Sequence, residues 1–286
     1  MGAVNEVWVP RLWWWLPQVL AIAIAISLLA CGGDRPRTGV IAPTGAASFT
    51  LMSFSDPLQL DALPPGWTHN TFWRHGPMDI RFVQKDGRRA VRLATRDSAS
   101  MLMRQVDVSL DEYPILRWEW LVEYGIRVAH DETTAGGDDH AARIYLTLED
   151  KQGQRRSLQF VWGGQQLKAG DYKQLSYLFD LIGPYAHYVV NGGEENWGRW
   201  HSESVDMREI YRTALGAPEG VRLVEVALFC DSDETNDASV AYFSELTVHR
   251  QRVSQLRQTG ISIEPGAGRP ILALSEFARV SGGRVE

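Results

Sequence analysis

The fold of this chain is indicated by the stretch Gly136-Gly137-Asp138-Asp139-His140-Ala141-Ala142-Arg143-Ile144-Tyr145-Leu146-Thr147-Leu148. From Ala142 onward apolar and polar residues alternate, which is typical of a half-buried antiparallel strand. The residues before it predict a loop, in which two glycines free the backbone and two adjacent carboxylates follow. Alternating stretches recur on both sides, and a second acidic loop runs from Asp231 to Asp237. The chain is therefore predicted to be a β-scaffold that presents acidic loops.

Length and composition fit a sizeable folded domain with no affinity for nucleic acid. The 286 residues, of which 44% are hydrophobic, provide enough material for one large core or two small ones. The formal net charge is −6, and no basic run or stripe is present, which argues against a nucleic-acid partner. The 26 glycines and 13 prolines suit the many turns of an all-β fold.

Residues 1–30 are predicted to be a lipoprotein signal peptide. A largely apolar run from Leu12 ends in Leu28-Leu29-Ala30-Cys31, with a small residue just before the expected cleavage point. This ending resembles the bacterial lipobox, in which the cysteine, here Cys31, is acylated and becomes the new N-terminus. Gly32 rather than Asp follows, which by resemblance to enterobacterial sorting implies an outer-membrane lipoprotein facing the periplasm or the cell surface. The alternative is an uncleaved anchor, because the run is close to spanning length.

The remaining chain divides into three parts. Residues 31–48 are predicted to be a tether, residues 49–252 the β-sandwich domain, and residues 253–286 a disordered tail. The second cysteine, Cys230, cannot pair with a lipidated Cys31. It ends an apolar run and has no basic neighbour in sequence, so we expect a buried thiol rather than a nucleophile.

Local signals define several elements. Asp86-Gly87 between two alternating stretches predicts a hairpin. Trp118 and Trp120 share the apolar face of another strand, which favours core aromatics over a sugar platform. Asp206 and Gly216 mark the two ends of one short helix. Residues 163–185 show no clear period. Roughly ten strands and one helix predict an all-β, two-sheet antiparallel β-sandwich.

Several of these motifs together resemble one bacterial family of secreted proteins, the domain-of-unknown-function family number three thousand and forty-seven. The motifs are Gly137 to Tyr145, Phe160-Val161-Trp162, and Asp231 to Thr235 followed by Ala241-Tyr242-Phe243. The family's Thr-Asp-Thr-Asp-Asn-Thr pattern is replaced here at its first and fifth places, by Cys230 and Glu234. The resemblance implies a jelly-roll-like sandwich similar to galactose-binding and carbohydrate-binding modules. It supplies no established activity.

The acidic loops are the sharpest chemical feature, since familiar catalytic motifs and zinc-spaced Cys/His sets are missing. Carboxylates of the type that calcium prefers occur at Asp138, Asp139, Asp231 and Asp233. If the two loops meet, their charges need a counter-charge. We expect Arg143 to bridge them in bidentate fashion, with a calcium ion as the alternative. Acidic turns that are merely solvated are a further alternative.

Three functions fit the sequence. The first, which we favour, is a lipid-anchored envelope protein that binds a saccharide without catalysis. The second is a polysaccharide-cleaving enzyme that uses the loop carboxylates, His140 and Arg143 in an open groove. The third is a structural lipoprotein that touches another envelope protein. Candidate ligand-binding or catalytic residues are Asp138, Asp139, His140, Arg143, Trp162, Trp197, Trp200, Asp231, Asp233 and Asn236, with Trp67 and Trp73 as further stacking candidates.

Overall fold

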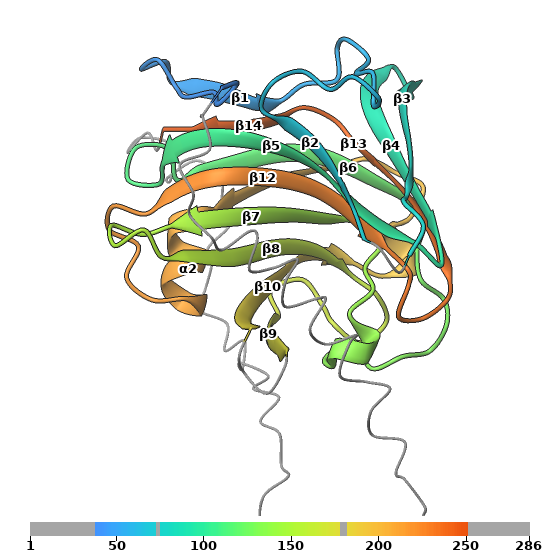
Figure 1. Ribbon diagram of the computed structural model, residues 1–286. Helices are drawn as coiled ribbons and strands as arrows, with labels where there is room; N and C mark the ends of the chain where they lie inside the picture. Colours follow the sequence, from blue (N-terminus) through green and yellow to red (C-terminus); the bar gives the residue numbers. More distant parts are fainter. Residues whose placement is uncertain (1–37, 73–74, 178–181, 251–286) are drawn as a thin grey trace, which may run out of the picture.

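The computed structural model describes residues 38–72, 75–177 and 182–250, and these form two seven-stranded sheets packed face to face (Figure 1). The predicted signal peptide, Cys31, Trp73 and the predicted tail lie outside the described residues. Within those residues, no helix has the length and apolar character needed to cross a membrane.

The first sheet follows the order β1-β14-β6-β13-β4-β3, and β11 also pairs with β6. Its strands are β1 (Ser48–Met52), β14 (Leu246–His249), β6 (Ile115–Tyr124), β13 (Ala238–Phe243), β4 (Arg88–Arg96), β3 (Asp79–Lys85) and β11 (His201–Asp206).

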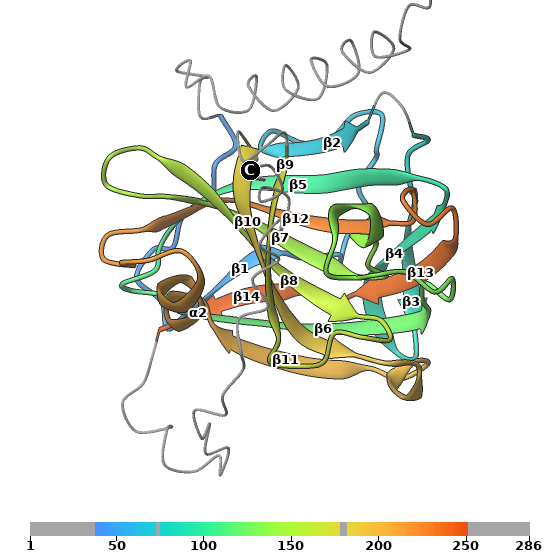
Figure 2. The same ribbon diagram turned by 90° about the horizontal axis from the view of Figure 1, so that it is seen from below.

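The second sheet follows the order β2-β5-β12-β7-β8-β10-β9. Its strands are β2 (Trp67–Thr71), β5 (Ala99–Ser109), β12 (Arg222–Asp231), β7 (Arg143–Glu149), β8 (Arg155–Gly163), β10 (Ile182–Gly192) and β9 (Tyr172–Tyr177). Strands β9 and β10, lowest in Figure 1, face the viewer in Figure 2.

This architecture confirms the predicted all-β sandwich. One pair departs from the antiparallel expectation, because β8 and β10 run parallel. The helix α2 (Met207–Ala214) is the one α-helix in the described ranges, and two short 3-10 turns, η2 (Ala135–Gly137) and η3 (Glu194–Asn196), lie in loops. As expected, the Asp206 side chain caps α2 by accepting a hydrogen bond from the Glu209 amide at 3.0 Å.

The predicted hairpin is also present, between β3 and β4. Lys85 lies opposite Arg88, and the two residues between them, Asp86 and Gly87, have φ of 51° and 78°. Positive φ at both central positions is the mark of the tight turn that Asp-Gly favours.

The core between the sheets is rich in aromatic rings. Trp118 and Trp120 are 3% and 0% exposed, and their ring centres lie 5.3 Å apart, which confirms that they are core aromatics. Trp118 stacks on Phe160 of the opposite sheet at 5.8 Å. Trp162 lies 5.5 Å from Trp120 and is 2% exposed. Trp162 is therefore a core residue and not the ligand-facing residue that we expected, because the alternation of β8 turns it inward with Phe160.

Two segments differ from the sequence prediction. Part of the expected tether follows the edge of the second sheet: Ile41 donates its amide to the Gln105 carbonyl, and its carbonyl accepts from the Asp107 amide at 2.8 Å. The region without clear period, residues 163–185, contains β9 and the start of β10. Strands form there without alternating polar and apolar residues because their backbone amides and carbonyls pair with those of neighbouring strands.

Candidate functional site

The two acidic loops meet at one end of the second sheet. Strands β12 and β7 are antiparallel neighbours with Phe229 opposite Arg143, so the end of β12 and the start of β7 share an edge. There the His140 amide donates to Asp231 Oδ1 at 3.0 Å. The Asp139 carboxylate accepts from the amide and the hydroxyl of Thr235 at 2.7 and 2.6 Å. These contacts fasten the loop before β7 to the loop after β12.

Arg143 joins the carboxylates of both loops, as predicted. Its Nε and Nη2 donate to the two oxygens of Asp231 at 3.1 and 2.6 Å, and its Nη1 donates to Asp138 at 3.1 Å. The side chain is 1% exposed. Burial acts to lower the pKa of Arg143, but Asp138 and Asp231 raise it overall. Burial raises the pKa of Asp231 well above its usual range, and the guanidinium of Arg143 and the amide of His140 oppose this rise.

Asp138 is the anion of a buried cluster that the sequence did not reveal. Around its Oδ1 lie Lys173 Nζ at 2.5 Å, His187 Nε2 at 3.4 Å and His140 Nε2 at 3.6 Å. Burial acts to raise the pKa of Asp138, and Arg143 and His187 bring it well below its usual range. Lys173 and His187 lie opposite each other on β9 and β10, so only the pairing of these strands brings them to the loop.

Two buried histidines flank the Asp138 carboxylate. His140 Nδ1 lies 3.1 Å from the Trp162 carbonyl and His187 Nδ1 lies 3.2 Å from the Tyr185 carbonyl, while the Nε2 atom of each ring faces Asp138. Burial lowers the pKa of both rings. With Asp138, His140 and Arg143 only 6%, 1% and 1% exposed, these residues do not line the open groove expected for a polysaccharide-cleaving enzyme. The loops bury them against the sheet.

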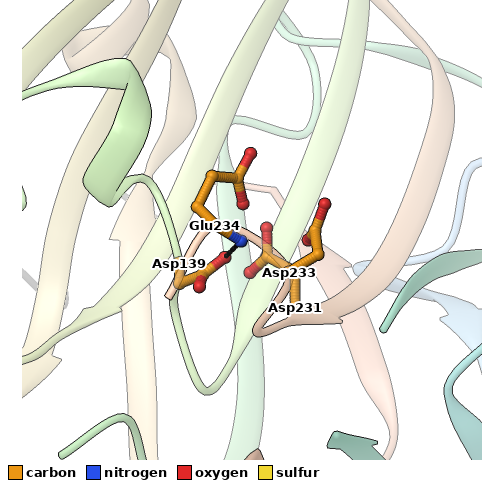
Figure 3. A group of neighbouring side chains, drawn as sticks. All are labelled: Asp139, Asp231, Asp233 and Glu234. Carbon is orange, nitrogen blue, oxygen red and sulfur yellow. Dashed lines mark hydrogen bonds between the residues drawn. The ribbon is translucent and has the colours of Figure 1, made fainter. Parts of the chain in front are cut away.

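A second carboxylate group lies beside this cluster (Figure 3). Ligand oxygens of Asp139, Asp231, Asp233 and Glu234 all fall within 4.8 Å of one another. This set differs from the predicted one, because Asp138 turns to Arg143 and Lys173, and Glu234 takes its place. Burial and the carboxylate of Asp139 raise the pKa of Glu234 to about 10. Carboxylates of this number suit calcium in ligand type, and a retained proton is the alternative way to relieve their repulsion.

The remaining candidate of the second loop, Asn236, lies in its turn. Asn236 is exposed and has a φ of 54°, a left-handed conformation that Asn tolerates better than most residues. Asp237 accepts from the amides of Arg127 and Val128 at 2.7 and 3.0 Å. These two hydrogen bonds join the second acidic loop to the segment that follows β6.

The predicted stacking tryptophans do not form one platform. Trp67 is 9% exposed and is covered by the Arg104 guanidinium, 4.9 Å from its ring centre. Trp200 packs against Tyr242 at 6.5 Å, on the outer face of the first sheet. Trp197 lines a pocket beside Asp139, whose volume of about 10 Å³ suits about one water molecule and no sugar ring.

Cys230 behaves as predicted. Its thiol is buried, donates to the Ala141 carbonyl at 2.8 Å, and has its pKa raised to about 12 by burial. A thiol of this kind is inert at neutral pH.

The outer face of the second sheet, away from the core, carries a further set that sequence analysis missed. One residue from each of five neighbouring strands lies in register across it: Gln105, Glu225, Thr147, Ser157 and Tyr185. We call this set the outer-face row. Tyr145 lies beside it on β7, and Ser157, Tyr185 and Glu225 all influence its pKa, which burial raises. Thr147 Oγ1 donates to Glu225 at 3.1 Å.

Most of these side chains combine polar atoms with partial exposure, whereas Ser157 is buried. Gln105, Tyr145, Thr147, Tyr185 and Glu225 are neither buried nor fully exposed. A signal was available in the sequence, because Arg143, Tyr145, Thr147 and Glu149 form the polar side of the alternation in β7. What the sequence could not show is which residues of other strands lie beside them.

The fold and the site define a two-sheet β-sandwich whose acidic loops close one end of a polar sheet face. A model of the family described as "Protein of unknown function (DUF3047)" matches residues 65–247, and the chain belongs to this family. No curated protein matches the chain.

Solved structures with a distant likeness include three carbohydrate-active proteins. An endoglucanase, Cel12A from Rhodothermus marinus, is 12% identical with a TM-score of 0.38, over 65% of this chain and 93% of that one. The xyloglucanase domain of NopAA from Sinorhizobium fredii is 13% identical with a TM-score of 0.38, over 71% and 98%. The agarase AgWH50C is 7% identical with a TM-score of 0.31, over 72% of this chain and only 25% of that one.

Proposed function

We propose that this protein is a membrane-tethered component of the cell envelope that binds a saccharide on the outer face of its second sheet. The observation that carries the proposal is the outer-face row together with Tyr145. Hydroxyl, amide and carboxylate groups on rigid neighbouring strands provide the donors and acceptors that sugar hydroxyls need. The tyrosines add apolar surface with a polar tip.

An exposed aromatic ring borders the same face. Phe72 is 37% exposed, and its ring centre lies 6.1 Å from that of Phe229 on β12. Phe229 in turn lies under the Arg143 guanidinium at 5.0 Å. The buried charge cluster therefore holds Phe229, which supports the exposed Phe72 ring on which the apolar face of a sugar could stack.

The tether and location belong to the same proposal. The Leu28-Leu29-Ala30-Cys31 ending supports lipidation at Cys31, and Gly32 in place of Asp after it supports an outer-membrane location. Mass spectrometry of the wild-type protein should find an acylated N-terminal cysteine, and Cys31→Ser should leave an unprocessed precursor without lipid. An intact leader on the wild-type protein would contradict this part of the proposal.

The binding test is a glycan array with the mature domain, followed by titration calorimetry on the best glycan. We expect Tyr145→Ala to weaken binding about tenfold or more, since a stacked or hydrogen-bonded contact of about 1.4 kcal/mol is lost. Tyr242→Ala is the matched control, because Tyr242 is a tyrosine on the outer face of the other sheet, where its hydroxyl donates to Glu123 at 2.6 Å. Absence of any binding, or an equal effect of both variants, would exclude this face.

The same assay bears on the enzymatic alternative. If the protein shortens the glycans that it binds, the products appear in the titration samples by mass spectrometry. The loop residues first proposed for cleavage are buried among their own partners, so the binding role is better supported.

A further inference from the structure

Charges on the outer face of the second sheet are almost all paired within the protein. Asp107 accepts from Arg222 Nε at 2.6 Å, and Glu149 accepts from Arg155 Nε at 3.0 Å. At the loop end, Arg143 and Lys173 are held by Asp231 and Asp138. None of these groups offers a net charge to a ligand.

Glu225 is the exception. In the part of the chain that the structure describes, no Lys, Arg or His nitrogen lies within 4 Å of its carboxylate, and its hydrogen-bond partner is the neutral hydroxyl of Thr147. The side chain is partly exposed and lies between Gln105 and Thr147 in the outer-face row. One carboxylate oxygen therefore accepts from Thr147, while the group as a whole presents a negative charge to anything lying on the face.

A backbone irregularity puts Glu225 in this position. The pairing register of β12 shifts between Leu223 and Glu225 against both neighbouring strands. Leu223 and Val226 both point into the core, so the shift reverses the alternation and turns Glu225 outward. Irregularities of this kind commonly re-aim a side chain near a binding site.

From this geometry we propose that Glu225 sets the ligand class: the face takes a neutral or amino-bearing glycan and rejects acidic ones. The inference rests on the proposed saccharide-binding function. A carboxylate accepts well from hydroxyl and ammonium groups, and it repels the carboxylate of a uronate. Since the cations on this face are already paired, no described residue offsets that repulsion.

The experiment compares three soluble hexasaccharides: a glucosamine hexamer, its N-acetylated counterpart and a galacturonate hexamer. The wild-type protein should bind one or both of the first two at least about tenfold more tightly than the third. Glu225→Gln should weaken glucosamine binding and strengthen galacturonate binding. Glu149→Gln is the matched control, because Glu149 is on the same face but paired with Arg155, and it should leave the order unchanged.

Two outcomes would overturn the inference: the galacturonate hexamer binding best to the wild-type protein, or Glu225→Gln leaving the order of the three unchanged. Failure of the wild-type protein to bind any of the three overturns it as well. The proposed function is judged separately by the wider array and by Tyr145→Ala. An acidic glycan that binds through Tyr145 would support the function and contradict the ligand class.

Discussion

Arg143 and Asp231, 88 positions apart in sequence, form a two-point ion pair with exposures of 1% and 4%. Each also contacts the loop before β7, Arg143 through Asp138 and Asp231 through the His140 amide. This pair therefore fastens the acidic loops to the sheet and fixes the end of the face on which we place the ligand.

Removing the guanidinium should be strongly destabilising. Arg143→Ala leaves Asp231 and Asp138 buried without their shared cation, and loss of one partner from a buried pair costs about 3–5 kcal/mol. Urea denaturation followed by tryptophan fluorescence measures this. Arg155→Ala is the control, since its pair with Glu149 is on the surface and should contribute less than about 1 kcal/mol. Equal losses of unfolding free energy in the two variants would show that the buried bridge stabilises the protein no more than the surface pair does.

Calcium should have little effect on the melting temperature. Arg143 already neutralises Asp231, Thr235 satisfies Asp139, and a raised pKa lets Glu234 keep a proton. Thermal melts in millimolar calcium and in excess chelator should coincide. If calcium raises the melting temperature by mass action, and Asp233→Asn abolishes the rise, a cation rather than the protein alone stabilises the carboxylate group.

Glu234 should make stability depend on pH in a defined direction. Its pKa rises from 4.5 to about 10 on folding, so the folded state binds a proton that the unfolded state releases above pH 4.5. The contribution of this group is thus fully present below pH 4.5 and is lost as the pH rises toward 10. Glu234→Gln removes the proton requirement.

The measurement is a series of urea midpoints from pH 4 to pH 9. Glu234→Gln should match the wild-type protein at pH 4 and be more stable at pH 9. The difference should be less than about 1 kcal/mol, because Glu234 is only partly covered by its neighbours and water screens the part that stays open. Exposed Glu195, outside the carboxylate group, provides the control Glu195→Gln, which should show no such trend. A constant difference at every pH would argue against a retained proton.

The aromatic core gives a simpler prediction. Trp118 is 3% exposed and stacks on Phe160 across the two sheets, so Trp118→Ala should destabilise the domain by about 3–5 kcal/mol. Trp200→Ala should cost less, because Trp200 is only half-buried on an outer face. Denaturation midpoints compare them. A smaller loss for Trp118 than for Trp200 would contradict the core assignment.

Much of the fold could be predicted because its signals are local. Alternation located β7, Asp86-Gly87 located a hairpin, and the Asp206 cap located α2. Even the Arg143 bridge was predictable, since the two acidic loops need a counter-charge and Arg143 is next to one of them. The edge pairing of Ile41 has no such signal, because it involves backbone atoms alone.

The rest of the site depends on strand pairing across large sequence separations. Lys173 and His187 come from a region without period, and they reach Asp138 only because β9 and β10 extend the sheet beneath the loop. Glu225 faces outward through a register shift that reverses the alternation in β12. A period-two pattern alone would not place it beside Thr147.

The central claim is tested most directly by locating a bound glycan on the protein. Backbone amide resonances of the isotope-labelled mature domain can be followed by NMR during titration with the best glycan from the array. We expect the largest shifts at the strand positions of Thr147, Ser157 and Glu225, with the outer face of the first sheet, at Glu119 and Leu121, unaffected. Shifts that gather around Trp197 or Trp200, and leave the outer-face row unchanged, would contradict the account.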